Sequence, residues 1–178
     1  MPRDSDEFEQ LLPPASSPVE APVARVSRKG PSLKARAIGY LSRREHSRLE
    51  LQRKLAPHAN PEDPDEIPRL LTELEHGNWL SNERFARSLV HRRASKKGAA
   101  LVVQELRQHG LPDADVQNLR EELNATEFDR AKAVWLKKFG TAPADARDYA
   151  RQMRFLASRG FSPSILRRIL GDLDDFPE

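Results

Sequence analysis

Apolar residues along the middle of this chain recur three and four positions apart, as they do along one face of an α-helix. Ile67, Leu70, Leu71 and Leu74 give a clear example. Nine stretches of this kind follow one another, and the short run 99–103, which alone resembles a strand, continues directly into helical spacing. The pattern predicts an all-α fold. The expected helices cover, in order, residues 32–41, 47–55, 67–74, 81–92, 102–106, 116–123, 126–139, 146–156 and 162–170.

One helix–turn–helix arrangement occurs three times along the chain. In residues 154–170 a helix ends, the chain turns at Gly160, and Ser162 suits the position before a new helix. Two earlier stretches, 38–51 and 103–116, follow the same order of apolar and helix-starting residues, although the first lacks the glycine. Repetition of helical units at this length is typical of arrays whose units bury their faces against neighbours. The sequence therefore predicts three tandem three-helix repeats, at residues 32–77, 78–124 and 125–171.

The two ends of the chain differ in composition from this helical body. Residues 1–31 hold prolines at positions 2, 13, 14, 18, 22 and 31, together with serine and scattered charge. Such a segment has too little apolar surface to offset the entropy lost on ordering, so we expect a disordered leader. Residues 172–178 are acidic, and we expect a frayed tail there.

The charge of the chain is concentrated in its body. The whole sequence has 30 Lys and Arg against 27 Asp and Glu, a net charge of +3. The leader accounts for four basic and five acidic residues and the tail for four acidic ones, so the body keeps 26 basic against 18 acidic, a net charge of +8. A basic body favours a polyanionic partner. The alternative is a set of arginine-rich helix faces that only contact solvent.

Residues that could carry catalysis or bind a metal are scarce. Cysteine is absent, which excludes disulfides and thiolate chemistry. The five histidines show no metal-ligand spacing, and we interpret them as surface residues. Serines take up positions at helix starts, such as Ser81 and the predicted capping box of Ser47 with Glu50. We therefore predict no catalytic residue, no metal and no cofactor. No apolar run is long enough to cross a membrane.

The large aromatic residues are expected to pack between helices. This interpretation covers Trp79, Trp135, Phe85, Phe128 and Phe161. Stacking on nucleic acid bases would instead require exposed rings beside cations. Trp79, close in sequence to Arg84, is the one candidate for that alternative.

Three motifs in this order resemble the bacterial RecX family of regulatory proteins. The first repeat has Ala37-x-x-Tyr40-Leu-Ser-Arg-Arg-Glu-His-Ser-Arg48 and then Glu50-Leu51-x-x-Lys54-Leu55. The middle has Leu74-x-x-Gly77-x-Trp79-Leu-Ser-Asn-Glu-Arg-Phe-Ala86, then Lys97-Gly98 and Glu105-Leu106, and the third has Arg154-Phe-Leu-x-x-Arg159-Gly-Phe-Ser162. The resemblance spans about residues 33–170. Two departures are Asn82, where the family usually has an acid, and Leu101, where a basic residue is common.

The resemblance implies both a shape and a partner. Family members are three tandem three-helix repeats in an elongated, curved molecule that binds in the groove of the RecA recombinase filament on DNA. They usually inhibit filament extension, ATP hydrolysis and strand exchange. For this chain the resemblance implies a cytoplasmic, monomeric regulator of DNA repair, recombination and the SOS response, without enzymatic activity. Its own binding to DNA is expected to be weak and without sequence selectivity.

Charge and helical facing suggest which residues contact the partner. In the middle repeat the densest cationic surface follows from residues three and four positions apart on one helix. Matching arginines occur in the first and third repeats. The predicted contact residues are Arg43, Arg44, Arg48, Arg84, Arg87, His91, Arg92, Arg93, Lys97, Arg151, Arg154 and Arg159.

Two other functions remain open from the residues alone. A stand-alone DNA-binding protein would place a recognition helix in the major groove, and the segment 47–55, with Arg48, Gln52 and Arg53 exposed, is the best candidate. Tight, sequence-selective binding without a recombinase would favour this alternative. A plain helical adaptor would bind neither nucleic acid nor a recombinase filament.

Overall fold

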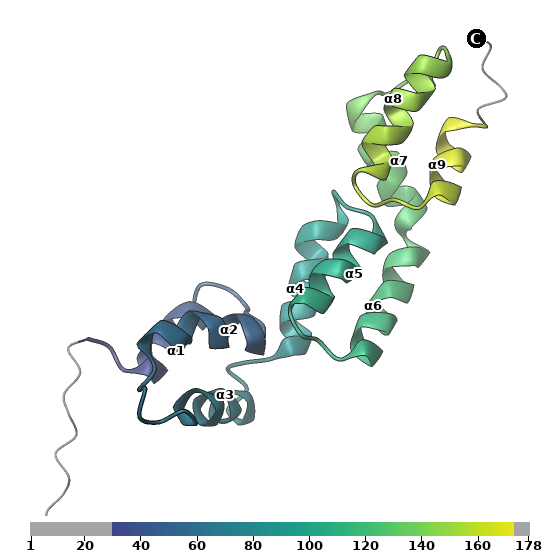
Figure 1. Cartoon of the computed structure of the whole chain (residues 1–178). Coiled ribbons are helices and arrows are strands. Elements are labelled where there is room, and N and C mark those ends of the chain that lie inside the picture. Colours follow the sequence, from purple (N-terminus) through teal and green to yellow (C-terminus); the bar gives the residue numbers. More distant parts are fainter. Residues whose placement is uncertain (1–29, 173–178) are drawn as a thin grey trace, which may run out of the picture. The chain divides into compact units, whose positions relative to one another are not determined.

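The structure, a computed structural model, describes residues 30–172, and nearly all of the predicted leader and tail lies outside this range. Within it the chain forms nine α-helices and one short 3-10 helix, without any strand (Figure 1). The prediction of an all-α fold is confirmed. The elements are α1 Leu33–Leu41, α2 Arg48–Leu55, η1 Ala56–His58, α3 Glu66–His76, α4 Asn82–Ala94, α5 Ala99–Gln108, α6 Asp113–Ala125, α7 Glu127–Lys138, α8 Ala146–Ala157 and α9 Pro163–Leu170.

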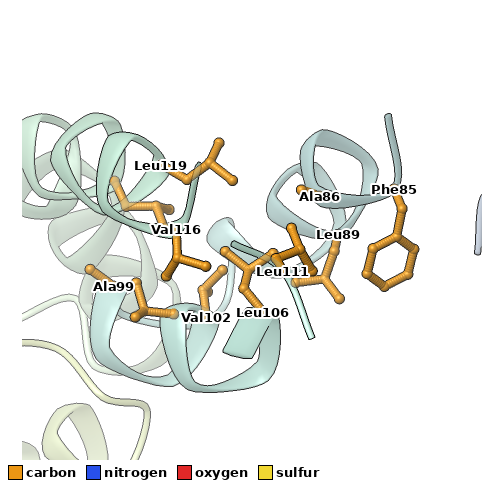
Figure 2. Close-up of a cluster of buried hydrophobic side chains, with 11 residues drawn as sticks. Phe85, Ala86, Leu89, Ala99, Val102, Leu106, Leu111, Val116 and Leu119 are labelled. Atoms are coloured by element: carbon orange, nitrogen blue, oxygen red, sulfur yellow. The ribbon is translucent and has the colours of Figure 1, made fainter. Parts of the chain in front are cut away.

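Three hydrophobic clusters divide the nine helices into sets of three. Leu51 and Leu71 lie in the cluster of α1–α3, and Trp135 and Leu166 lie in that of α7–α9. Figure 2 shows the cluster of α4–α6, where Leu106 and its neighbours point toward one another. The three-helix repeats predicted from sequence are therefore confirmed, while their proposed boundaries and the curved shape stay predictions. Because a core built from three short helices is small, each unit depends on contacts with its neighbour.

Side chains before α1, α2, α4 and α8 accept a hydrogen bond from a backbone amide in the first turn of the helix. The hydroxyl oxygen of Ser47 accepts a hydrogen bond from the backbone N–H of Glu50 at 3.0 Å, and that of Ser81 accepts from the N–H of Arg84 at 3.2 Å. The predicted capping box is only half formed, because the Glu50 carboxylate binds the guanidinium of Arg44. A cation near the start of α2 competes for that carboxylate, and the sequence pattern does not reveal this.

Neighbouring repeats are joined by the same kind of hydrogen bond. The backbone N–H of Arg48, at the start of α2, donates to Oδ1 of Asn82 at 2.9 Å, and Asn82 is the first residue of α4. The N–H of Ala99, at the start of α5, donates to Oε1 of Glu127 at 2.8 Å, and Glu127 is the first residue of α7. In both cases the first helix of one repeat caps the second helix of the repeat before it. We call these contacts the first and second inter-repeat joints.

The second joint also brings two glycines into backbone contact. The N–H of Gly98 donates to the carbonyl oxygen of Arg159 at 2.8 Å. A Cβ added at Gly98 would lie 2.0 Å from the carbonyl oxygen of Gly160, and one added at Gly160 would lie 2.5 Å from Cγ of Leu101. The close approach therefore requires glycine at both positions. Leu101 lies at this joint, against Gly160.

Arg130 closes the second joint from the side of α7. Its guanidinium donates to the carbonyl oxygens of Ala94 and Lys97, both at 2.8 Å, and to that of Leu123 at 2.7 Å. Burial lowers the pKa of Arg130 from its ordinary value, and the charge of Glu127 opposes that shift. These bonds satisfy carbonyls at the ends of α4 and α6, where a helix leaves its last oxygens without partners.

Replacing Glu127 by alanine should lower the free energy of unfolding by about 2–3 kcal/mol, because the carboxylate is 3% exposed and its loss strands a buried amide. Glu127→Gln keeps an acceptor oxygen and should lose less than half of that amount. Urea unfolding followed by far-UV circular dichroism measures both values. Equal losses for the two variants would show that the hydrogen bond at Ala99 is not what Glu127 contributes.

Candidate partner-binding surface

Half of the twelve predicted contact residues are tied to other parts of the chain. In the first repeat, Nη1 of Arg44 donates to Glu50 Oε2 at 3.0 Å, which closes the turn before α2. Arg48 forms an ion pair with Glu75 and donates to Oγ1 of Thr72 at 3.3 Å, so it links α2 to α3. These contacts hold the repeat together, and they occupy the guanidinium groups that sequence reasoning assigned to a partner.

Arg84 links the first two repeats. Its Nε donates to Glu45 Oε1 at 2.8 Å, and its Nη1 donates to Oδ1 of Asn78 at 2.7 Å. Nη2 donates to the carbonyl oxygens of Asn78 and Trp79 at 3.0 and 3.2 Å. With every branch of the guanidinium engaged, Arg84 positions the segment between α3 and α4.

Arg93 and Lys97 bind a residue of another helix in their own repeat, and Arg159 contacts Phe155 four positions earlier. Arg93 Nε and Lys97 Nζ both donate to the Glu105 carboxylate, at 3.0 and 3.3 Å, and so connect the end of α4 to α5. Burial acts to raise the pKa of Glu105, but these two hydrogen bonds outweigh it, and the pKa lies below its ordinary value. Arg159 lies over the ring of Phe155, with its guanidinium carbon 3.6 Å from the ring centroid, next to the second joint.

The other six predicted residues remain exposed to a partner. Arg43, His91 and Arg154 form no ion pair or side-chain hydrogen bond with any residue between 30 and 172. The side chains of Arg87, Arg92 and Arg151 contact only residues of their own helix or their own repeat. Such exposed pairs contribute little stability. Glu83 pairs with Arg87, Ser88 with Arg92, and Asp148 with Arg151. We call the five arginines of this set, Arg43, Arg87, Arg92, Arg151 and Arg154, the outer cations.

Comparison with known proteins places this arrangement in a family. A family model described as the third three-helix domain of RecX matches residues 125–170, and one described as the second three-helix domain matches residues 81–118. The regulatory protein RecX of Ralstonia nicotianae is 56% identical over 143 residues, which cover 80% of this chain and 89% of that protein. The chain belongs to the RecX family. The resemblance predicted from the three sequence motifs is confirmed.

Other members of the family agree with this assignment. RecX of Neisseria meningitidis serogroup B is 38% identical over 139 residues, which cover 78% of this chain and 89% of that protein. The crystal structure of RecX from Lactobacillus salivarius has a TM-score of 0.64 at 19% identity and covers 81% of this chain and 96% of that one. A second RecX crystal structure has a TM-score of 0.63 at 23% identity, covering 79% and 74%. At these identities the two structures establish the shared fold.

The histidines of this RecX-family chain are not all at the surface. His46 is 3% exposed, so the prediction of a surface position is wrong for it, and His109 is half-buried against the ring of Phe85. Nδ1 of His46 lies 2.9 Å from the carbonyl oxygen of Arg44, and Nδ1 of His109 lies 3.2 Å from Oγ of Ser47. Both rings pack around the turn before α2, where hydrogen bonds replace contacts with water.

Stability should therefore fall as the pH drops below about 6.5. Burial lowers the pKa of both His46 and His109 below 6.5, although the charge of Glu50 opposes the shift in each case. Below pH 6.5 the unfolded chain binds protons that the folded chain does not, and this favours unfolding. Urea unfolding at pH 7.5 and 5.5 should show the loss, and the difference should shrink in a His46→Gln/His109→Gln variant. An unchanged difference in the double variant would contradict the assignment.

The predicted aromatic core is correct in part. Phe85 and Phe161 are buried, and buried Trp135 donates from Nε1 to Oε1 of Gln152 at 2.6 Å. Phe128 is half-buried, with the guanidinium of Arg168 over its ring at 4.5 Å. The prediction is wrong for Trp79, which is 58% exposed, because the adjacent Leu80 occupies the core position instead.

Sequence reasoning missed one arginine of this surface. Arg147, Arg151 and Arg154 line a shallow hollow on α8 together with Ala144, Asp145 and Asp148. The spacing of the three arginines, four and then three positions, was the available signal. Within residues 30–172 no cluster of acidic or histidine side chains could hold a metal ion, and no helix there has the length and apolarity of a membrane span.

Proposed function

We propose that this RecX-family chain binds the RecA recombinase filament on DNA, in the helical groove, and inhibits its ATP hydrolysis, filament extension and strand exchange. The observation that carries the proposal is the separation of the predicted cations into two groups. One group is tied within and between repeats, and the other group, the outer cations, is left to bind a partner.

The inter-repeat joints suggest how the chain inhibits a recombinase by binding alone, without any covalent reaction. Backbone amides of Arg48, Ala99 and Gly98 donate the hydrogen bonds that join each repeat to the next, to two side chains and one backbone carbonyl. Repeats fixed in this way can engage neighbouring filament subunits together and compete for space that incoming DNA requires. Binding one filament state more tightly than another shifts the population toward that state by the difference in affinity.

A stand-alone DNA reader is less well supported. Helix-turn-helix proteins place the first residues of their recognition helix against base edges. In this chain the start of α2 is covered, because its first amide binds Asn82 and the side chain of Arg48 pairs with Glu75. Gln52 and Arg53 are exposed, but they leave only the later turns of a short helix for base contacts.

Co-sedimentation tests the proposed partner. The chain is mixed with RecA filaments on single-stranded DNA, with RecA alone, and with DNA alone, and the pelleted fraction is measured. We expect it to pellet strongly with filaments and weakly with DNA. Equal pelleting with DNA alone would favour the DNA-binding alternative. Absence of the chain from the pellet in all three mixtures would favour a plain adaptor.

A further inference from the structure

Trp79 is held in a fixed position at the surface between α3 and α4. The backbone N–H groups of Trp79 and Leu80 both donate to the carbonyl oxygen of Leu74, at 2.9 and 3.1 Å. Leu80 is 2% exposed and takes the position facing the core, so the indole of Trp79 points away from it. Asn78 has a φ of 58°, a left-handed conformation that asparagine adopts more readily than most residues. The exposed ring is thus a consequence of the backbone path.

Contacts on both sides of the segment limit the movement of this ring. Arg84 donates three hydrogen bonds to Asn78 and to the carbonyl oxygen of Trp79, and its Nε is anchored on Glu45. A Cβ added at Gly77 would lie 3.0 Å from Cδ1 of Trp79, so the edge of the indole rests on the glycine backbone. An aromatic ring positioned in this way loses little entropy when it binds.

The surroundings of the ring are cationic rather than apolar. Two segments meet there, 42–48 and 81–94, because Arg84 binds Glu45 and Asn82 binds the amide of Arg48. Together they contain seven arginines and two glutamates, and Glu50, Glu75 and Glu105 from outside the segments pair with three of the arginines, which leaves a net charge of +2. Trp79 and Leu136 are the exposed large apolar residues of the described chain, and they belong to different repeats. A protein contact of the usual kind would need an apolar centre around the ring, whereas an isolated ring among cations suits a base flanked by phosphates.

We propose that Trp79 stacks on a nucleobase of single-stranded nucleic acid while Arg43, Arg87 and Arg92, the arginines of these segments that bind no other part of the chain than their own helix, contact the neighbouring phosphates. A duplex hides its base faces, so single strands should be preferred over double strands. The proposal goes beyond the regulation of a filament, because it requires no recombinase and is tested on this chain alone.

Tryptophan fluorescence gives a direct test. A Trp135→Phe variant leaves Trp79 as the single tryptophan, and it is titrated with oligothymidylate and, separately, with a duplex of equal length. We expect saturable quenching by the single strand and little by the duplex. Trp79→Ala should weaken binding of oligothymidylate, measured by anisotropy of a labelled strand, by about 10-fold or more. Trp79→Phe should keep much of the affinity. Should Trp135→Phe fail to fold, the fluorescence difference between the unmodified chain and Trp79→Phe reports the same ring.

Leu136→Ala is the matched control, since it removes the other exposed large apolar side chain and should leave binding unchanged. Unaltered affinity in Trp79→Ala would overturn the proposal, as would absence of oligothymidylate binding or binding without quenching. If Trp79→Ala binds the strand normally but inhibits RecA less, the ring contacts protein and the proposal is wrong. A chain that binds no oligothymidylate but still inhibits RecA would overturn this proposal and leave the proposed function intact. The two proposals can therefore fail separately.

Discussion

Replacing Gly98 by alanine should lower the free energy of unfolding by about 3 kcal/mol. The new methyl group would lie 2.0 Å from the carbonyl oxygen and 2.2 Å from the carbonyl carbon of Gly160. Both are backbone atoms, so no side chain can rotate away, and the two segments must separate. Their separation breaks the hydrogen bond from Gly98 to Arg159 and weakens the second inter-repeat joint. Urea unfolding followed by circular dichroism measures the loss.

Gly39→Ala is the matched control for this substitution. Gly39 lies within α1, and a Cβ there would meet no atom within 4 Å. Alanine should therefore raise stability by about 0.5–1 kcal/mol, the usual gain in a helix interior. A Gly98→Ala variant as stable as the unmodified chain would show that the two repeats are not held in contact at this point.

Reversing the charge of four outer cations should raise the concentration needed for half-inhibition of RecA by about 10-fold or more. The variant carries Arg43→Glu, Arg87→Glu, Arg92→Glu and Arg154→Glu. Its helical content should stay unchanged, because none of these side chains links one repeat to another. Arg84 is left intact even though sequence reasoning placed it in the same surface, since its loss would release the segment that carries Trp79.

A second variant with four substitutions distinguishes binding through a specific surface from an effect of the net charge of the chain. Arg107, Arg120, Lys137 and Lys138 are exposed, lie outside the outer cations, and undergo the same total change when replaced by glutamate. RecA inhibition, measured through ATP hydrolysis, should be nearly normal for this control. Equal loss of inhibition in both variants would mean that overall charge, and not the outer cations, determines binding.

The helices and most of the core could be predicted from the sequence, because apolar spacing reports burial directly. Leu71 and Leu106, for example, lie in the clusters that their spacing indicates. Adjacent apolar residues were harder to assign. Trp79 and Leu80 both suit a core position, and the left-handed turn at Asn78 determines that only Leu80 occupies it.

The partners of the charged residues could not be predicted from helical spacing alone. The sequence pattern places Arg93 and Lys97 on a surface that faces a partner, yet both bind Glu105 on another helix. The side chain of Asn82, the first residue of α4, caps α2 of the neighbouring repeat. Glu127 holds the corresponding position in the next joint, where its carboxylate accepts from the amide of Ala99. Such contacts join residues far apart in sequence, and only the folded chain reveals them.

The central claim is that the outer cations serve a chain that regulates a recombinase filament. Titration of the unmodified chain into RecA bound to single-stranded DNA, with ATP hydrolysis followed throughout, tests it most directly. We expect hydrolysis to fall in a saturable manner, with inhibition weakening as salt is raised. Hydrolysis that stays constant over the whole titration, while the chain remains folded, would contradict the claim.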